Sequence, residues 1–427
     1  MRRKLPLLSM VFLLGFSMSS HIAAAAIYYV DNSGSPACGN SPTNGSASNP
    51  WCTITYGVGH IAGGDTLYVK AGMYKENVYI NGPAGTASAP TLISTYPGHL
   101  VTIAGAGVNT GRVKIANTSY IAFDGFTITN FNQGLFVENS QRITVQNVTV
   151  HHVGQEGIHV ISNSSYVTIQ NSKVHDTRQW QYNGEGIYVG QGSTGPLDNS
   201  NNVTIRNNTV YNVNDEGIEL KPGTHDCVVE GNNVYQALLD PLYSGSGAGA
   251  IEVNESNNGN QVWNSNPNHV VRNNRVHDTK MGIRAGTGAR VYNNVIYNII
   301  GTFPGVYVTN SNGDSYTRRI YHNTVDLPSS RAIVVSSGTA DVMNNIGPAT
   351  TNNIATSDAY YVGKTVEDYH LASGTAPINA GRDLANIVPT DIEGKSRVTN
   401  PPPDFGAYEY YDMNGGPPAA PTGLRVV

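Results

Sequence analysis

The amino-acid sequence predicts an all-β protein folded as a parallel β-helix solenoid with three short strands in each coil. One observation behind this prediction is a Gly-Ile-x-Val pattern that recurs, with variants, every 23 to 33 residues at Gly134–Val137, Gly157–Val160, Gly186–Val189, Gly217–Leu220, Ala250–Val253, Gly282–Ala285, Gly305–Val308 and Ala332–Val335. Another is an alternating run that ends at Asn and precedes a short apolar strand, as at Ile143–Asn147, Val167–Asn171, Val203–Asn207, Val270–Asn273, Val291–Asn293 and Ile320–Asn323. A unit of this period cannot bury its apolar face alone, so successive coils must stack into one continuous core.

The composition excludes several classes of protein. Only 13% of the 427 residues are charged, 39% are apolar, and 47 are glycine. The apolar residues come in short regular bursts, which is not typical of a disordered chain, and no 3.6-residue stripe predicts long helices. The formal net charge of −5 argues against a nucleic-acid partner. It permits an acidic substrate, because a bound cation or a few basic groups can reverse the field in one cleft.

The first 26 residues have the pattern of a secretory signal peptide. Three basic residues are followed by an apolar segment over Leu5–Phe16 and by small residues over Ala23–Ala26. No later stretch has the roughly 18 consecutive apolar residues of a membrane span. We therefore expect a protein that is secreted, to the extracellular space or the periplasm, without a membrane span and as a monomer.

Residues 27–100 are predicted to form an N-terminal cap and the first coils. The expected elements are short strands at Ile27–Val30, Thr53–Thr55 and Asp65–Lys70, and a short helix at Tyr56–Ala62 that closes the end of the core. Cys38 and Cys52 flank a loop rich in Gly, Ser, Asn and Pro, and are expected to form a disulfide. Cys227 occupies an apolar strand position, which favours a buried unpaired thiol.

Residues 101–350 hold the repeats. Asn at the turns suits left-handed backbone geometry, and its amide can hydrogen-bond from coil to coil, so we interpret this column as structural. Residues 351–411 lose the repeat and are expected to form a C-terminal cap, whose end Pro403–Tyr410 resembles the closing segment of many secreted bacterial β-helix proteins. Residues 412–427 are interpreted as a linker and the truncated start of a fibronectin type III-like module.

The variable residue of the Gly-Ile-x-Val pattern is expected to point outward, because its neighbours on both sides are apolar and point inward. Listed by coil, this outward column is Phe136, His159, Tyr188, Glu219, Glu252, Arg284, Tyr307 and Val334. The position before the Gly adds Glu156, Glu185 and Glu216, and the position two after the variable residue adds Lys221 and Asn254. We expect these side chains to share one exposed face of the solenoid.

Four carboxylates of this face predict a metal site. Glu185, Asp215, Glu216 and Glu219 can converge from two adjacent coils. Carboxylates this close repel one another, which raises their pKa values unless a cation lies among them. Hard oxygen ligands in such a group suit Ca²⁺.

The same face has the groups that β-elimination on a uronic acid requires. The C5 proton is weakly acidic, so the adjacent carboxylate must be neutralised and a Lys or Arg must remove the proton. Lys221 is the expected base, and Arg284 is expected to bind the uronate carboxylate or to act as base in its place. Further substrate contacts are expected from His159, Tyr188, Glu252, Asn254 and Tyr307.

The repeats, the signal peptide and an opening pattern of Tyr29–Val30, Asn49–Ile54 and Gly64–Val69 resemble the secreted right-handed parallel β-helix superfamily of polysaccharide lyases. The stretch Asp215–Glu219 is similar to the Asp-Asp-Gly-x-Asp calcium motif of one pectate lyase group, with Glu for two of the Asp residues. The resemblance implies a calcium-assisted lyase acting on an acidic polysaccharide.

A second lyase pattern overlaps the first. Asn214-x-Glu216 followed by Lys221 resembles the Glu-x-Glu…Lys arrangement of the chondroitinase B and alginate lyase group, in which the metal lies beside the lysine base and an Arg from a neighbouring coil assists. Here Asn replaces the first Glu, the next coil has Glu252 in place of Arg, and Arg284 lies two coils away.

Other interpretations remain open at this stage. The charged column can be a solvated ladder of salt bridges, and the solenoid a non-catalytic glycan-binding or structural protein. A glycoside hydrolase of the same fold can use Glu216, Glu219 or Glu252 as a carboxylate pair, although the Gly-His-Gly and Asn-Thr-Asp patterns of polygalacturonases are missing. A C5-epimerase shares the first proton abstraction, but the Asp-Pro-His signature of the alginate epimerases is also missing.

Overall fold

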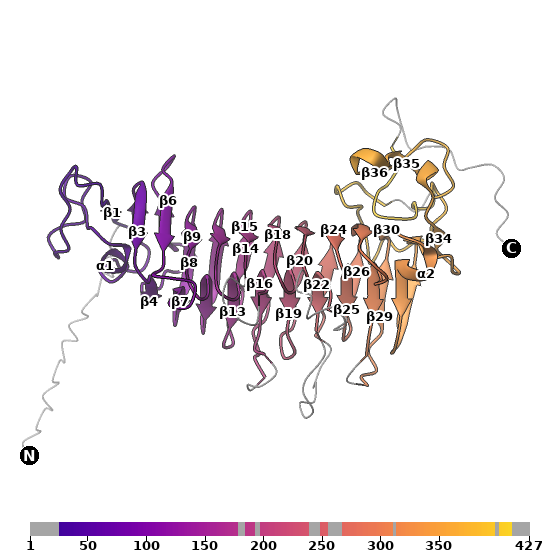
Figure 1. Ribbon diagram of the computed structural model, residues 1–427, viewed down its shortest axis with the longest axis horizontal. Coiled ribbons are helices and arrows are strands. Elements are labelled where there is room, and N and C mark those ends of the chain that lie inside the picture. Colours follow the sequence, from indigo (N-terminus) through magenta and orange to yellow (C-terminus); the bar gives the residue numbers. More distant parts are fainter. Residues whose placement is uncertain are drawn as a thin grey trace, which may run out of the picture.

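The computed structural model describes residues 25–177, 184–192, 197–238, 248–254, 267–310, 313–397 and 401–411. The chain winds into an elongated solenoid whose N-terminal and C-terminal coils lie at opposite ends (Figure 1). Each coil contributes one strand to each of three long parallel sheets, which confirms the predicted all-β parallel β-helix with three strands per coil. In the described chain, no helix is long and apolar enough to cross a membrane.

We refer to the three parallel sheets as sheets 1, 2 and 3. Sheet 1 consists of β1 (Ile27–Val30), β2 (Thr66–Val69), β5 (Thr91–Thr95), β8 (Ser119–Asp124), β11 (Gln141–Gln146), β14 (Thr168–Gln170), β17 (Thr204–Arg206), β20 (Val228–Glu230), β23 (Val270–Arg272), β26 (Arg290–Tyr292), β29 (Arg318–Tyr321) and β32 (Ala340–Met343). Sheet 2 consists of β4 (Tyr79–Asn81), β7 (Val113–Ala116), β10 (Leu135–Glu138), β13 (Ile158–Ile161), β16 (Ile187–Val189), β19 (Ile218–Leu220), β22 (Ile251–Val253), β25 (Ile283–Ala285), β28 (Val306–Val308) and β31 (Ile333–Val335). Sheet 3 consists of β3 (Gly72–Lys75), β6 (Val101–Ala104), β9 (Thr127–Thr129), β12 (Thr149–His151), β15 (Lys173–His175), β18 (Thr209–Tyr211), β21 (Asn233–Tyr235), β24 (Arg275–Thr279), β27 (Val295–Ile299), β30 (Thr324–Asp326), β33 (Ile346–Gly347) and β34 (Ile354–Ala355).

The Gly-Ile-x-Val copies form sheet 2, in the register that the repeat predicts. Ile187 pairs with Ile218, and Ile218 pairs with Ile251, so identical positions of successive coils lie side by side. These isoleucines are fully buried and belong to one continuous apolar core that runs through the solenoid. Because the register is constant, the outward position of each coil also forms one column.

The turn asparagines occupy two columns, where the sequence analysis expected one. Asn147, Asn171 and Asn207 have left-handed backbones, with φ of 54°, 52° and 56°. A separate ladder of coil-to-coil amide bonds is made by the next residue along the chain, which is buried in every coil of the ladder except the last. This asparagine ladder consists of Asn208, Asn232, Asn274, Asn294, Asn323, Asn345 and Asn353, with Nδ2 to Oδ1 distances of 2.8 to 3.0 Å. The left-handed asparagines also form bonds between coils, but nearer the surface: Asn139 Nδ2 donates to Asn117 Oδ1 at 2.8 Å, and Asn147 Nδ2 donates to Asp124 Oδ1 at 2.7 Å.

The outer face of sheet 3 has a stack of aromatic rings that the sequence analysis did not anticipate. The rings are those of His151, His175, Tyr211, Tyr235, His277 and Tyr297, with successive centroids 4.7 to 5.1 Å apart and interplanar angles of 5° to 14°. This spacing equals the separation of neighbouring strands, about 4.8 Å, so in-register rings stack face to face. The stack reinforces the coil register.

The N-terminal end is capped by a helix, with bounds that differ from the prediction. Helix α1 is Ile54–Val58, and Thr53 is its N-cap, whose side chain accepts a hydrogen bond from the Tyr56 amide. The expected strand at Thr53–Thr55 is therefore wrong, because a Thr with a free acceptor favours the start of a helix. The predicted Cys38–Cys52 disulfide is present, and Cys227 is a buried free thiol as predicted.

The C-terminal segment packs against the last coils. It contains two 3-10 helices (Asp358–Tyr360 and Lys364–Val366) and an antiparallel pair, β35 (Tyr361–Gly363) with β36 (Asp368–Leu371), whereas the short helix α2 (Ser329–Ala332) lies between β30 and β31 within the coils. The β35–β36 pair lies beside the orange coils in Figure 1, and its tyrosines pack on Tyr297 of sheet 3. Of the predicted signal peptide the structure describes only Ala25 and Ala26, and the predicted tail at 412–427 lies outside the described residues.

Candidate active site

The outward column of sheet 2 forms as predicted. Tyr188 on β16 pairs with Glu219 on β19, Glu219 pairs with Glu252 on β22, and Glu252 pairs with Arg284 on β25. His159 and Tyr307 extend the column at its two ends. The sequence therefore identified correctly which side chains lie next to one another.

The exposed face that we expected is wrong, because the middle of this column is covered. Glu219 is 0% and Glu252 is 1% exposed, and Tyr188 and His159 are also buried. The ends of neighbouring strands and turns provide part of the cover: Asn254 Nδ2 donates to Glu219 Oε1 at 2.7 Å, and the Gly249 amide donates to Glu252 Oε2 at 3.0 Å. A salt-bridge ladder in solvent is therefore excluded as a description of these residues.

Close packing at Gly186 helps to place the carboxylates that precede this position in successive coils. A Cβ on Gly186 would lie 2.5 Å from the carbonyl oxygen of Gly217 in the next coil. Glycine is therefore required at position 186, and the residues that precede Gly186 and Gly217, Glu185 and Glu216, stand beside one another in successive coils. Their backbones are joined directly, since the Gly186 amide donates to the Glu216 carbonyl at 2.9 Å.

Three carboxylates converge beside this entry point. Glu185, Glu216 and Glu219 each offer an oxygen, and these oxygens lie within 4.8 Å of one another. Burial, together with the charge of Glu219, raises the pKa values of Glu185 and Glu216 well above the usual range. Asp215 is fully buried nearby and contributes to the raised pKa of Glu185, but it is not one of the three whose oxygens converge. The structure thus brings together three of the four predicted metal ligands.

Lys221 lies at the edge of this carboxylate cluster. Its ammonium is 2.6 Å from Glu219 Oε1 and 5.1 Å from the centre of the Tyr188 ring, and its side chain is 18% exposed. Burial lowers the pKa of Lys221, but the charge of Glu219, which also accepts a hydrogen bond from the ammonium, outweighs burial and raises the pKa above its ordinary value. Lys221 is therefore held protonated.

Arg284 forms the next ion pair along the column. Its Nη1 lies 2.8 Å from Glu252 Oε1, and its Nε donates to Thr309 Oγ1 at 3.3 Å. Burial raises the pKa of Glu252 to about 7, although Arg284 opposes the shift. Tyr307 follows Arg284 in register and is partly exposed, so the column opens toward solvent at this end.

At the other end the column closes. The His159 ring stands edge-on between Phe136 and Tyr188, with centroids 4.6 and 4.5 Å away. His159 Nε2 donates to the Gly190 carbonyl at 2.8 Å, and burial lowers the pKa of the imidazole, which keeps it neutral. His159 packs among aromatic rings, so its position supports a role in shaping the site more than direct contact with a polymer.

The site has more acidic than basic side chains, so a bound cation would improve its charge balance. Five buried acidic residues, Glu185, Asp215, Glu216, Glu219 and Glu252, face two ion-paired basic ones, Lys221 and Arg284. Glu185 Oε2 and Glu219 Oε2 are buried and have no hydrogen-bond partner among the described residues. Buried carboxylate oxygens without donors are costly unless a cation is bound, and an all-oxygen donor set is the one that Ca²⁺ prefers. The residues present therefore fit a calcium ion.

Glu156 is a neighbour to which the sequence analysis gave no role. It is buried, accepts a hydrogen bond from Gln133 Nε2 at 3.0 Å, and contributes to the raised pKa of Glu185. The sequence did contain a signal for Glu156: it stands directly before Gly157, in the same repeat position as Glu185 in the following coil. It adds to the negative charge at one side of the cluster.

The three-sheet solenoid with this buried cluster on sheet 2 defines a right-handed parallel β-helix protein. The family model described as "Pel9A-like, right handed beta helix region" matches residues 28–274, more than half of the chain, and the chain belongs to this family. No curated protein sequence matches the chain significantly.

Solved structures show the same fold. Pectate lyase Pel9A superposes with a TM-score of 0.59 and 18% identity, covering 92% of this chain and 98% of that one. An alginate lyase from Paenibacillus sp. str. FPU-7 gives 0.55 and 18%, covering 71% and 98%. A GH136 lacto-N-biosidase from Eubacterium ramulus gives 0.50 and 13%, covering 77% and 67%. The similar structures thus include both lyases and a hydrolase, and at these identities they establish the fold alone.

Proposed function

We propose that this protein is a secreted lyase that cleaves a uronic-acid-containing polysaccharide by calcium-assisted β-elimination. The observation that carries the proposal is the Lys221 ammonium 2.6 Å from Glu219, at the edge of three converging buried carboxylates. A lysine is a suitable base for carbon acids, and a cluster of carboxylates beside it suits a cation that polarises the substrate. The pectate and alginate lyases among the similar structures support this choice of reaction.

Calcium would be held by Glu185, Glu216 and Glu219, with Asp215 adding negative charge behind them. A calcium ion held there would supply positive charge to neutralise the uronate carboxylate and make the C5 proton more acidic. Lys221, whose pKa is raised mainly by the charge of Glu219, would then be left in a buried site that favours its neutral amine. We therefore expect the base to be competent only in the calcium-loaded protein.

The reaction needs one proton to leave C5 and one to reach the leaving oxygen. Neutral Lys221 accepts the C5 proton, the electron pair forms the C4–C5 double bond, and the C4–oxygen bond breaks. Tyr188 lies beside Lys221, and burial and the charge of Glu219 raise the pKa of its hydroxyl, so Tyr188 retains a proton to donate to the leaving oxygen.

The remaining side chains of the column would position the sugar. Arg284, held by Glu252 and Thr309, presents a fixed positive charge for the uronate carboxylate. Tyr307, at the partly exposed end, offers a ring on which a sugar can stack. Asn254 is bonded to Glu219, so it orients the carboxylate as well as facing the substrate. The His159 ring packs edge-on against the Tyr188 ring and so helps to fix its orientation.

Export is part of the proposal. A disulfide joins Cys38 to Cys52, and disulfides persist in oxidising compartments, in agreement with the predicted signal peptide. Together these features support secretion to the periplasm or the extracellular space, where acidic polysaccharides are accessible.

Hydrolysis is the second candidate function. Burial raises the pKa of Glu252 to about 7, which suits a general acid, and a lacto-N-biosidase is among the similar structures. The ion pair of Glu252 with Arg284 and the lysine in the cluster favour elimination over this alternative.

The test is to incubate the protein with polygalacturonate, alginate or chondroitin sulfate, with calcium or with chelator. We expect a calcium-dependent rise in the ultraviolet absorbance of the unsaturated uronate, absent in Lys221→Ala and retained in Lys173→Ala, an exposed lysine on sheet 3. Reducing sugar without this absorbance would establish hydrolysis instead. If neither unsaturated uronate nor reducing sugar forms, a non-catalytic binding or structural role would be favoured.

A further inference from the structure

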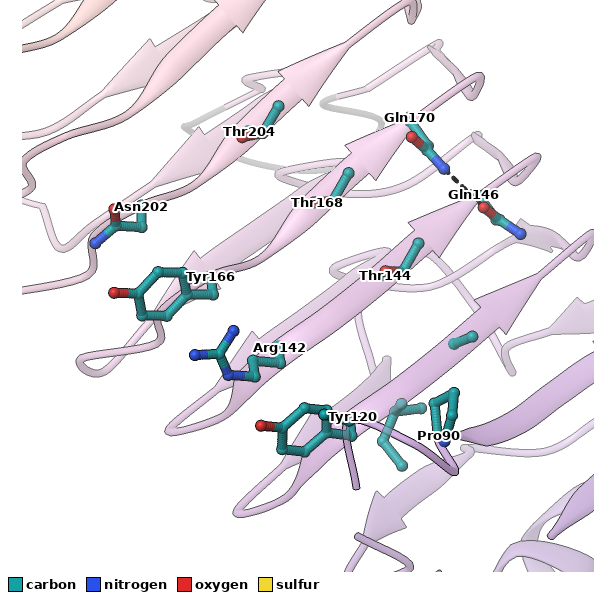
Figure 2. Close-up of a pocket in the computed structure, with 13 residues that line it drawn as sticks. Pro90, Tyr120, Arg142, Thr144, Gln146, Tyr166, Thr168, Gln170, Asn202 and Thr204 are labelled. Atoms are coloured by element: carbon teal, nitrogen blue, oxygen red, sulfur yellow. Dashed lines mark hydrogen bonds between the residues drawn. The ribbon is translucent and has the colours of Figure 1, made fainter. Parts of the chain in front are cut away.

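A second site lies on sheet 1, away from the carboxylate cluster of sheet 2. A groove of about 710 Å³ crosses the outer face of β8, β11, β14 and β17. Figure 2 shows Tyr120, Arg142 and Tyr166 in a row along one side, and threonines and glutamines of the same strands beside them. The groove runs across the strands, which is along the axis of the solenoid.

The row occupies a column of left-handed backbone positions. In three other coils of this column the residues are Asn202, Asp226 and Asn268, with φ of 52°, 54° and 55°. Asn and Asp tolerate this conformation better than other residues with a side chain. Tyr120, Arg142 and Tyr166 adopt the same conformation, with φ of 54°, 55° and 54°.

Three consecutive coils thus place bulky residues where the fold favours Asn or Asp. Bulky side chains at positive φ cost stability, and such strain concentrates at functional sites. The substitution of Asn or Asp by Tyr-Arg-Tyr adds no apolar core, because Tyr166 is 49% exposed. A gain in the stability of the fold therefore does not explain why Tyr120, Arg142 and Tyr166 occupy these positions.

The geometry of the row is that of a binding platform. The Arg142 guanidinium lies 4.5 Å from the centre of the Tyr166 ring and 5.6 Å from that of Tyr120, so the two rings hold it between them. Among the described residues no carboxylate forms an ion pair with Arg142, and its charge faces the groove.

The part of the groove beside the Tyr120–Arg142–Tyr166 row, its floor, is lined by polar side chains that recur from coil to coil. Thr144, Thr168 and Thr204 are in register across β11, β14 and β17. Gln170 Nε2 donates to Gln146 Oε1 at 2.7 Å, which holds the two amides along the groove (Figure 2). Neighbouring coils lie about 4.8 Å apart, close to the length of one pyranose unit, so a sugar chain laid along the axis meets the same groups at each residue.

We propose that this groove binds an anionic polysaccharide along the solenoid axis, apart from the candidate active site. Sugar rings stack on Tyr120 and Tyr166, and Arg142 pairs with a uronate carboxylate between them. The hydroxyls and amides of the floor hydrogen-bond the sugar edges. The inference goes beyond the proposed function, because it needs neither calcium nor catalysis at sheet 2.

The column itself provides variants that should fold well. Tyr166→Asn and Arg142→Asn install the residue type that the left-handed position favours, so we expect thermal stability to be kept or raised. Asp226→Asn changes the same column outside the groove and is the matched control. All are made in the Lys221→Ala protein with chelator present, so that no cleavage occurs during binding.

Binding to polygalacturonate and to alginate is measured by affinity electrophoresis, with dextran as a neutral polymer. We expect each groove variant to weaken binding of the acidic polymers about tenfold or more, while Asp226→Asn binds like its parent. Unchanged binding in both groove variants would overturn the proposal, and so would equal binding of dextran. Cleavage of short uronate oligosaccharides by the groove variants with Lys221 intact is a separate readout, which fails only if the proposed function at sheet 2 fails.

Discussion

The ammonium of Lys221 lies 2.6 Å from Oε1 of Glu219, the residue two positions before it on the same outward face. Glu219 is fully buried, and Lys221, the residue directly after strand β19, reaches it with a side chain that is partly exposed. The pair therefore joins a buried acidic cluster to the open side of sheet 2. The lysine is close enough to respond to any change in the charge of that cluster.

Replacing the lysine separates catalysis from binding. Lys221→Ala should lower kcat by roughly 100- to 10,000-fold, the usual contribution of a positioned base, and should leave KM within a few-fold. Steady-state kinetics on the best acidic substrate would show this. A large rise in KM with kcat unchanged would assign Lys221 to substrate binding instead.

Calcium should stabilise the protein, and Glu216 should decide how much. At a concentration one hundred times Kd, a ligand that binds the native state adds about 2.7 kcal/mol to the free energy of unfolding. Glu216→Gln removes one of several buried like charges, so it should raise the Tm of the calcium-free protein and abolish the rise caused by calcium.

Differential scanning fluorimetry with calcium and with chelator is the measurement for Glu216. Glu138→Gln is the control, because Glu138 lies at the end of β10 on the same sheet and is paired with Lys114. A calcium effect that is equal in both variants would contradict the assignment of the cluster as a metal site.

His269 should contribute a loss of stability as the pH is lowered from about 6.5 to about 4, opposite in sign to the contribution of the carboxyls of Glu185 and Glu216, whose pKa values are raised. His269 is fully buried, and burial lowers its pKa to about 4, so the folded protein keeps it neutral while the unfolded chain takes up a proton near pH 6.5. The stability is complete above the unfolded pKa and is lost as the pH falls toward the folded one, by up to about 3 kcal/mol. His269→Gln should flatten this part of the pH profile in urea titrations, and an unchanged slope would exclude His269 as its source.

The asparagine ladder should carry much of the stability of the coils. Asn274 donates to the Val229 carbonyl at 3.0 Å and to Asn294 Oδ1 at 2.9 Å, and its own Oδ1 accepts from Asn232. Asn274→Ala leaves several buried groups without partners and should cost about 3 kcal/mol. Asn81→Ala, at an exposed end of β4, should cost less than about 0.5 kcal/mol in the same denaturation experiment.

The placement of the site residues shows how far local patterns can be used. The Gly-Ile-x-Val repeat predicted the register of Tyr188, Glu219, Glu252 and Arg284 correctly, because stacked coils of one pattern align equivalent positions. The expected exposure of Tyr188, Glu219 and Glu252 was wrong, because contacts such as Asn254 with Glu219 come from the ends of neighbouring strands, which the repeat does not describe.

The groove on sheet 1 was missed for a related reason. Tyr120, Arg142 and Tyr166 are about 22 to 24 residues apart and belong to no motif, and only their common left-handed backbone shows that they replace Asn or Asp. The split of the turn asparagines into two columns was missed in the same way, since adjacent residues such as Asn207 and Asn208 look equivalent until the backbone of each is known.

The sequence alone determined the solenoid and the neighbours within each column, because alternating apolar residues of this period can be buried only by stacking coil on coil. Only the tertiary structure decided which of those side chains are buried, that Lys221 is ion-paired with Glu219, and that three of the four predicted ligands converge. Burial and charge pairing depend on contacts between segments distant in the sequence, and the low dielectric of the covered site then sets the pKa values on which its chemistry depends.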